Sequence, residues 1–145
     1  MTDLNVRKKQ SWDGMFYSIQ RIDLLVISIC GAGIYVCLET IKYLSTNKQE
    51  CGLLIKLSGA LFLIGIILNF LSQQFGYKAN EQDYLMCETL LEGGDKISDE
   101  EKAEADKFDK KADFFSSLTT WFNYASMTVM FLGLILTLIF FTITF

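Results

Sequence analysis

The sequence predicts an all-α integral membrane protein with three transmembrane helices and a cytoplasmic antiparallel helical hairpin that extends spans two and three. Hydrophobic residues make up 51% of the 145 positions, and the charged residues are gathered in a few blocks. The chain has no proline, so nothing of that kind would kink or end a long helix. Three long apolar runs are each at least as long as the roughly 20 residues that cross a hydrocarbon core.

Residues 1–21 are expected to form an amphipathic segment on the inner membrane surface. Apolar side chains recur there at helical spacing, and Ser11 is a candidate N-cap. The apolar positions are Trp12, Met15, Phe16 and Ile19. The chain would then turn into the first span.

Residues 22–75 contain the first two spans, as the apolar runs 22–44 and 53–75. The third span lies in 114–145, which is longer than a membrane crossing requires. Trp121 and Tyr124 suit the membrane interface, so the span itself is predicted near residues 123–145.

The segment 76–113 is predicted to be a cytoplasmic helical hairpin. Gly93 and Gly94 mark its turn, and the sequence from Ser98 to Glu101 fits a capping box. One helix is therefore expected to end near Glu92. The next should begin near Asp99 and continue without a break to the end of the third span. Each arm of about 20 residues would project roughly 30 Å.

The distribution of basic residues predicts the orientation. Of the 13 lysines and arginines, 10 lie in residues 1–21 and 76–113. Basic residues favour the cytoplasmic side. We therefore expect a multi-pass protein of the inner (plasma) membrane, with the N-terminus in the cytoplasm and the C-terminus outside.

The composition argues against catalysis and against cofactors. The chain has no histidine, which excludes histidine relays, histidine-ligated haem and ordinary catalytic zinc sites. No metal site is expected either, because the acidic cluster after Ser98 lacks the spacing of a calcium-binding loop. Cys30 and Cys37 fall inside an apolar run, where thiols usually act as small hydrophobic filler. No basic patch interleaved with aromatic residues is present, so nucleic acid is not an expected partner.

Each span carries a stripe of polar or small residues, which membrane helices use either to pack closely or to face water. Glu39 stands out, because a carboxylate within a span is costly unless it is paired or wetted. A local ion pair with Lys42 is one interpretation, and a ring of Glu39 side chains around an oligomer axis is the other. The candidate pore-lining residues are Ser28, Tyr35, Glu39, Lys42, Asn69, Asn123 and Thr137. The candidate packing glycines are Gly31, Gly33, Gly65 and Gly133.

These features favour a small homo-oligomeric membrane channel or pore, gated through its cytoplasmic hairpin. The expected partners are the lipid bilayer, further copies of the chain, and a soluble protein or ligand at the hairpin. Two alternatives remain open: a non-conducting accessory or scaffold subunit that docks a soluble partner, and a holin-like lysis protein. No motif identifies a family. The layout, with an amphipathic lead-in, a tight two-span unit and a long cytoplasmic helix, resembles the small membrane effectors that bacteria use against phage, from which the third span is a departure.

Overall fold

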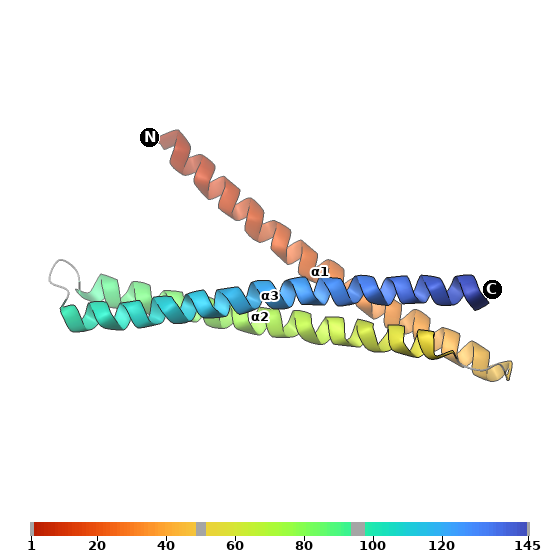
Figure 1. Cartoon of the computed structure of the whole chain (residues 1–145). Helices are drawn as coiled ribbons and strands as arrows, with labels where there is room; N and C mark the ends of the chain where they lie inside the picture. Colours follow the sequence, from red (N-terminus) through yellow and green to blue (C-terminus); the bar gives the residue numbers. More distant parts are fainter. Residues whose placement is uncertain (1, 49–51, 94–97, 145) are drawn as a thin grey trace. The chain divides into compact units, whose positions relative to one another are not determined.

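The protein consists of three long α-helices in the part of the chain that the structure describes (Figure 1). It is a computed structural model, which describes the backbone of residues 2–48, 52–93 and 98–144 and the side chains of 20–48, 52–91 and 98–144. The helices are α1 (Thr2–Thr46, 45 residues), α2 (Leu53–Gly93, 41 residues) and α3 (Asp99–Thr144, 46 residues). At about 1.5 Å per residue, each is roughly 60–70 Å long. The all-helical prediction is confirmed.

All three helices are long and apolar enough to cross a membrane. The stretches that qualify are Gln20–Thr46, Leu53–Leu91 and Asp99–Thr144. Only 17%, 28% and 17% of the most apolar window in each is buried within the chain. Most of their apolar side chains therefore face outwards, as Leu24, Leu138 and Ile143 do.

The start of α1 corrects one prediction. α1 is continuous from Thr2 to Thr46, so Ser11 lies inside the helix and is not its N-cap. The helix also does not end before residue 22. The sequence between Ser11 and Arg21 contains no proline, and the single Gly14 lowers helix propensity without ending the helix.

The start of α3 follows the predicted capping box. The backbone N–H of Ser98 donates to Oε2 of Glu101 at 2.7 Å, and the backbone N–H of Glu101 donates to Oγ of Ser98 at 3.2 Å. Both hydrogen bonds satisfy amides that have no partner inside the first helical turn. The first residue of α3 is Asp99, as predicted, and the helix then continues to Thr144.

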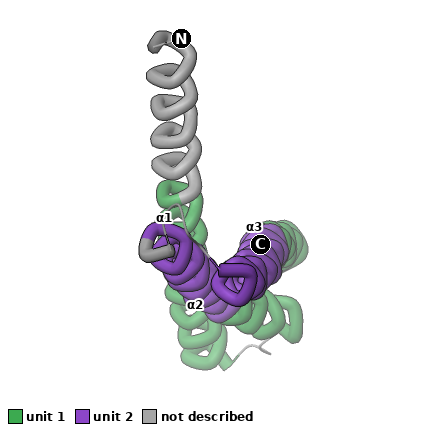
Figure 2. Tube along the Cα trace, turned by 90° about the vertical axis from the view of Figure 1, so that its left-hand side faces the viewer, with its two compact units in different colours: residues 1–66, 126–145 green, residues 67–125 purple. Residues whose placement is uncertain are grey.

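The chain divides into two compact units, shown in different colours in Figure 2. Unit 1 comprises residues 1–66 and 126–145, and unit 2 comprises residues 67–125. α2 and α3 each contribute to both units, so the apolar ranges 53–75 and 114–145 are both divided between them.

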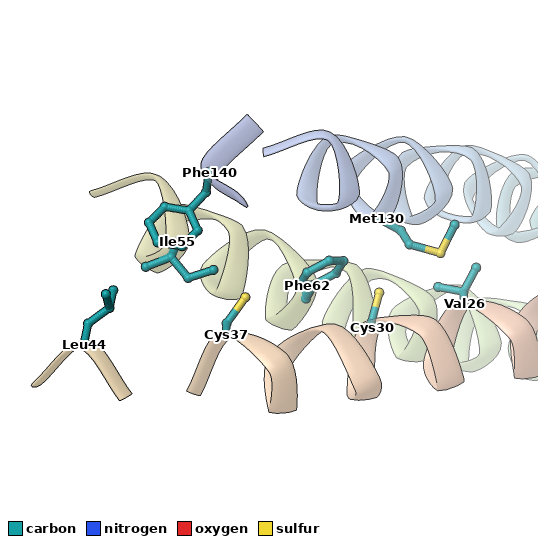
Figure 3. Close-up of a cluster of buried hydrophobic side chains, with 8 residues drawn as sticks. All are labelled: Val26, Cys30, Cys37, Leu44, Ile55, Phe62, Met130 and Phe140. Atoms are coloured by element: carbon teal, nitrogen blue, oxygen red, sulfur yellow. The ribbon is translucent and has the colours of Figure 1, made fainter. Parts of the chain in front are cut away.

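Unit 1 has a core to which all three helices contribute (Figure 3). The core residues are Val26, Cys30, Cys37 and Leu44 of α1, Ile55 and Phe62 of α2, and Met130 and Phe140 of α3. The two thiols are buried among apolar side chains, as predicted for small hydrophobic filler.

Unit 2 is an antiparallel pair formed by the second part of α2 and the first part of α3. Ser72 Oγ donates to the carbonyl of Thr119 at 2.9 Å. Further along α2, the Phe75 ring stacks on Phe115 and Phe122, with centroids 6.2 Å and 5.2 Å apart. Later positions in α2 thus meet earlier positions in α3, which is the pairing of antiparallel neighbours.

Candidate functional site

α1 has two opposite faces of different chemistry. Its buried face consists of Val26, Cys30, Cys37 and Leu44. The predicted residues Ser28, Tyr35, Glu39 and Lys42 are all exposed. At about 100° per residue, these four lie within a sector of about 60°, centred opposite the buried face. We call them the polar face of α1.

The two charges of the polar face form an ion pair. Lys42 Nζ lies 3.7 Å from Glu39 Oε1, and the two side chains are 75% and 50% exposed. Tyr35, one turn before Glu39, is 66% exposed. An ion pair this open contributes little to folding, since exposed pairs contribute about 0–1 kcal/mol. Its groups are accessible to a second chain, to water or to ions.

The other three candidate pathway residues lie in different surroundings. Asn69 is fully buried, and its Oδ1 accepts a hydrogen bond from Gln73 Nε2 at 3.1 Å. Thr137 is half-buried, and its hydroxyl shares a 2.6 Å hydrogen bond with Ser58 and lies 3.0 Å from the carbonyl of Gly133. Asn123 is also half-buried. Thr137 therefore takes part in the α2–α3 packing of unit 1, whereas Asn69 and Asn123 belong to unit 2.

Polar residues of α2 form hydrogen bonds with α3. Ser58 of α2 is buried and donates to the carbonyl of Gly133 of α3 at 2.7 Å, in unit 1. Ser72 and Thr119 make the corresponding contact in unit 2. These hydroxyls act as interhelical hydrogen-bond donors, which is how polar groups join apolar helices.

Two of the candidate glycines enclose the ring of Phe62. A Cβ atom added at Gly33 would lie 2.5 Å from Cε2 of the ring, and one added at Gly133 would lie 2.9 Å from Cε1. The ring is fully buried, so the two glycine backbones form the walls of its site. Phe62 was not predicted from the sequence as a site residue. The signal was present, because Phe62 is the one large residue at helical spacing within the α2 stripe of Ser58, Gly65, Asn69 and Ser72.

The other candidate glycines differ among themselves. A Cβ atom at Gly65 would lie 3.1 Å from the Cys30 sulfur, which marks another close helix contact. Nothing lies within 4 Å of such an atom at Gly31. Gly31 is two positions before Gly33, and at about 100° per residue this turns it by about 200° to the exposed side. Gly93 is the last residue of α2. Gly94, the other predicted turn residue, lies outside the described residues.

A second polar feature, not predicted from the sequence, lies in unit 2. Seven residues of α2 and α3 line an open hollow of about 460 Å³: Lys78, Glu81, Gln82, Lys110, Lys111, Phe114 and Phe115. Its basic residues are spread over two segments that are distant in the sequence, so only the antiparallel pairing brings them together.

Neither feature resembles a metal centre. Among the described residues, no group of three or more cysteine, aspartate or glutamate side chains could hold a metal ion.

The sequence matches no protein-family model, and comparisons with curated proteins and with solved structures give no significant match.

Proposed function

We propose that this chain is an integral membrane protein whose three helices cross a bilayer. The exposed apolar windows of the helices support this placement, since such extensive apolar surface suits lipid and would drive association in water. The basic residues then place residues 1–21 and 76–113 in the cytoplasm and residue 145 outside. The 76–113 segment forms the cytoplasmic hairpin of this arrangement.

The polar face of α1 is the observation that carries the functional proposal. A charged side chain costs about 2.5–3.5 kcal/mol at the centre of a membrane helix on insertion scales, so Glu39 and Lys42 favour contact with water or with a protein partner over contact with lipid. The core of unit 1 covers only the opposite side of α1. Several copies of the chain could meet along the polar face and enclose an aqueous path.

We therefore assign the chain to the small homo-oligomeric channels or pores, with α1 next to the axis. Glu39 would form a ring of carboxylates that attracts cations, and Lys42 would limit that attraction near the outer end. Ser28 and Tyr35 would line the inner part of the path. In this proposal Thr137 helps to hold α2 and α3 together through its hydrogen bond with Ser58.

The cytoplasmic hairpin is the proposed gate. α2 and α3 run without a break from the apolar windows into this segment, so a ligand or protein bound there could act on the membrane part. A bacterial membrane effector against phage is the specific role that the layout favours.

Thiol labelling tests the membrane placement. Cys87 is exposed in the described part of the chain, and we expect it to react with an impermeant maleimide only after cells are permeabilised. Cys51, which lies outside the described residues, should react in intact cells. The opposite pattern would overturn the orientation.

Cross-linking tests the oligomer. In a background with Cys51→Ser and Cys87→Ser, the variants Ser28→Cys and Tyr35→Cys should form disulfide-linked dimers in native membranes under mild oxidation. Leu138→Cys is the matched control, because Leu138 is as exposed as Tyr35 but lies on α3. Equal cross-linking of all three positions would contradict an interface specific to α1.

Conductance in planar bilayers tests the pathway. Glu39→Gln removes one charge per subunit and should weaken cation preference while the oligomer persists. Lys56→Gln, a charge change at an exposed position near the start of α2, should leave selectivity unchanged. Unchanged selectivity in an intact Glu39→Gln oligomer would remove Glu39 from the pathway. Monomeric or silent wild-type protein would instead favour the non-conducting accessory subunit.

A further inference from the structure

The hollow near Lys78 gathers positive charge in an acidic part of the chain. Residues 76–113 contain 12 acidic and 6 basic residues, yet three of those six lysines line this one hollow, with Glu81 as its only acidic residue. Among the described residues, no ion pair joins Glu81 to Lys78, Lys110 or Lys111. The hollow is therefore a local basic site, formed where α2 and α3 pack in unit 2.

Aromatic rings support two of these lysines. Lys78 Nζ lies 5.7 Å from the centre of the Phe115 ring, and Lys111 Nζ lies 5.9 Å from that of Phe108. Such cation–π contacts hold an ammonium group in place while its hydrogen-bond donors stay available. Phe114, which also lines the hollow, is 61% exposed and offers an apolar surface beside the charges.

The neighbouring residues indicate where this hollow would lie in a membrane. The stacked rings of Phe75, Phe115 and Phe122 lie towards the apolar windows, and Trp121 packs edge-on against Phe122. Aromatic residues gather at the level of the lipid headgroups. The lysines follow within about two turns of these rings on the cytoplasmic side, which is where anionic lipids attract basic clusters.

We propose that this hollow binds the headgroup of an anionic phospholipid, such as phosphatidylglycerol, from the inner leaflet. Its phosphate pairs with Lys78, Lys110 and Lys111, and the glycerol ester region lies against Phe114. The site rests on the proposed membrane placement but requires no conductance. Its position at the base of the cytoplasmic hairpin makes lipid composition a regulator of the proposed gate.

The test compares two charge-matched variants in bilayers of phosphatidylcholine with about a tenth phosphatidylglycerol. Lys110→Gln/Lys111→Gln should lower the preference for bound phosphatidylglycerol over phosphatidylcholine by about tenfold or more, since each lysine near an anionic surface contributes about fivefold. Lys102→Gln/Lys107→Gln removes the same charge from the same helix outside the hollow, and its preference should stay near that of the wild type. Native mass spectrometry of the released protein counts the bound lipids. Equal losses in both variants would show general electrostatic attraction and overturn the site.

A further arm defines the ligand. Displacement of lipid by millimolar glycerol 3-phosphate would identify a soluble phosphate compound as the ligand and overturn the lipid assignment. If the membrane placement itself were wrong, the wild-type protein would stay in solution without detergent, which distinguishes that failure from a failure of the site.

Discussion

The polar residues of α1 and those of the α2–α3 pair have similar spacing in the sequence but different surroundings in the structure. Ser58 and Ser72 are buried, and each donates to a carbonyl of α3. Glu39 and Lys42 are open and contact each other across a single helical turn. The first set completes the packing of the chain, whereas the second is not covered by the described part of the chain. Such an uncovered polar stripe is the kind of surface on which the proposed pathway depends.

The largest expected difference between packed and exposed positions comes from substitutions of the glycines. Gly33→Ala or Gly133→Ala would place a Cβ atom within 3 Å of the buried Phe62 ring, and overpacking of this kind costs about 1–3 kcal/mol. Alkylation of the buried thiols Cys30 and Cys37 in detergent should then become roughly tenfold faster or more. Gly31→Ala, with nothing within 4 Å, is the matched control and should leave the rate unchanged. An equal response at all three positions would contradict the enclosure of Phe62.

A smaller effect is expected from the serines. Ser58→Ala loses hydrogen bonds to the Gly133 carbonyl and the Thr137 hydroxyl, and interhelical hydrogen bonds contribute about 0.6 kcal/mol on average and up to about 1.7. Ser28→Ala, on the polar face of α1, should change the free energy of unfolding by less than about 0.5 kcal/mol. Unfolding by sodium dodecyl sulfate in mixed micelles measures both. A larger loss for Ser28→Ala would place that serine in the packing of the chain.

The start of α3 is a third case, in which polar atoms of Ser98 and Glu101 form hydrogen bonds with each other. The backbone N–H of Ser98 and, to a smaller extent, its hydroxyl lower the pKa of Glu101. This stabilisation is present above the ordinary carboxyl pKa of about 4.3 and is lost as the pH falls through the lowered value. The protection factor for amide exchange at Lys102, whose N–H bonds to the Ser98 carbonyl, should fall at low pH in the wild type. In Glu101→Gln it should lack this additional pH dependence.

The smallest expected effect on folding belongs to the charges of α1. Because Lys42 and Glu39 are three-quarters and half exposed, Glu39→Gln should change the free energy of unfolding of the isolated chain by less than about 0.5 kcal/mol. The same unfolding titration measures it, with Lys42→Gln alongside. A loss of several kcal/mol would mean that the pair is structural, the alternative to a role in the proposed pathway.

Local patterns predicted much of this fold. The capping box identified the first residue of α3 because its partners are only three residues apart. The absence of proline predicted long helices, and it also explains why α1 continues through Ser11, where a helix start was expected. The two buried thiols were predicted from their apolar context.

The side of each helix that packs against the others could not be predicted from the sequence, and the reason is physical. In an apolar window, hydrophobicity does not decide which residues are buried: Leu24 and Leu38 of α1 are 66% and 59% exposed, whereas Cys30 and Cys37 are buried. Small residues allow two helices to approach closely, so the size and shape of the side chains determine which side of a helix is buried. The Phe62 site and the basic hollow near Lys78 both combine residues from distant segments. The α2 stripe marks the position of Phe62 but not the two glycines that enclose it, and no single helix reveals the hollow.

The enclosure of Phe62 also sets how the ring itself can move. A phenyl ring turns over about its Cβ–Cγ bond only when the surrounding atoms briefly withdraw, and here the Gly33 and Gly133 backbones stand at its two edges. The two edges of the ring should therefore give separate nuclear magnetic resonance signals at low temperature, which merge on warming. The rate of that exchange measures how often the helices of unit 1 separate, a fluctuation required by any rearrangement that passes through this packing.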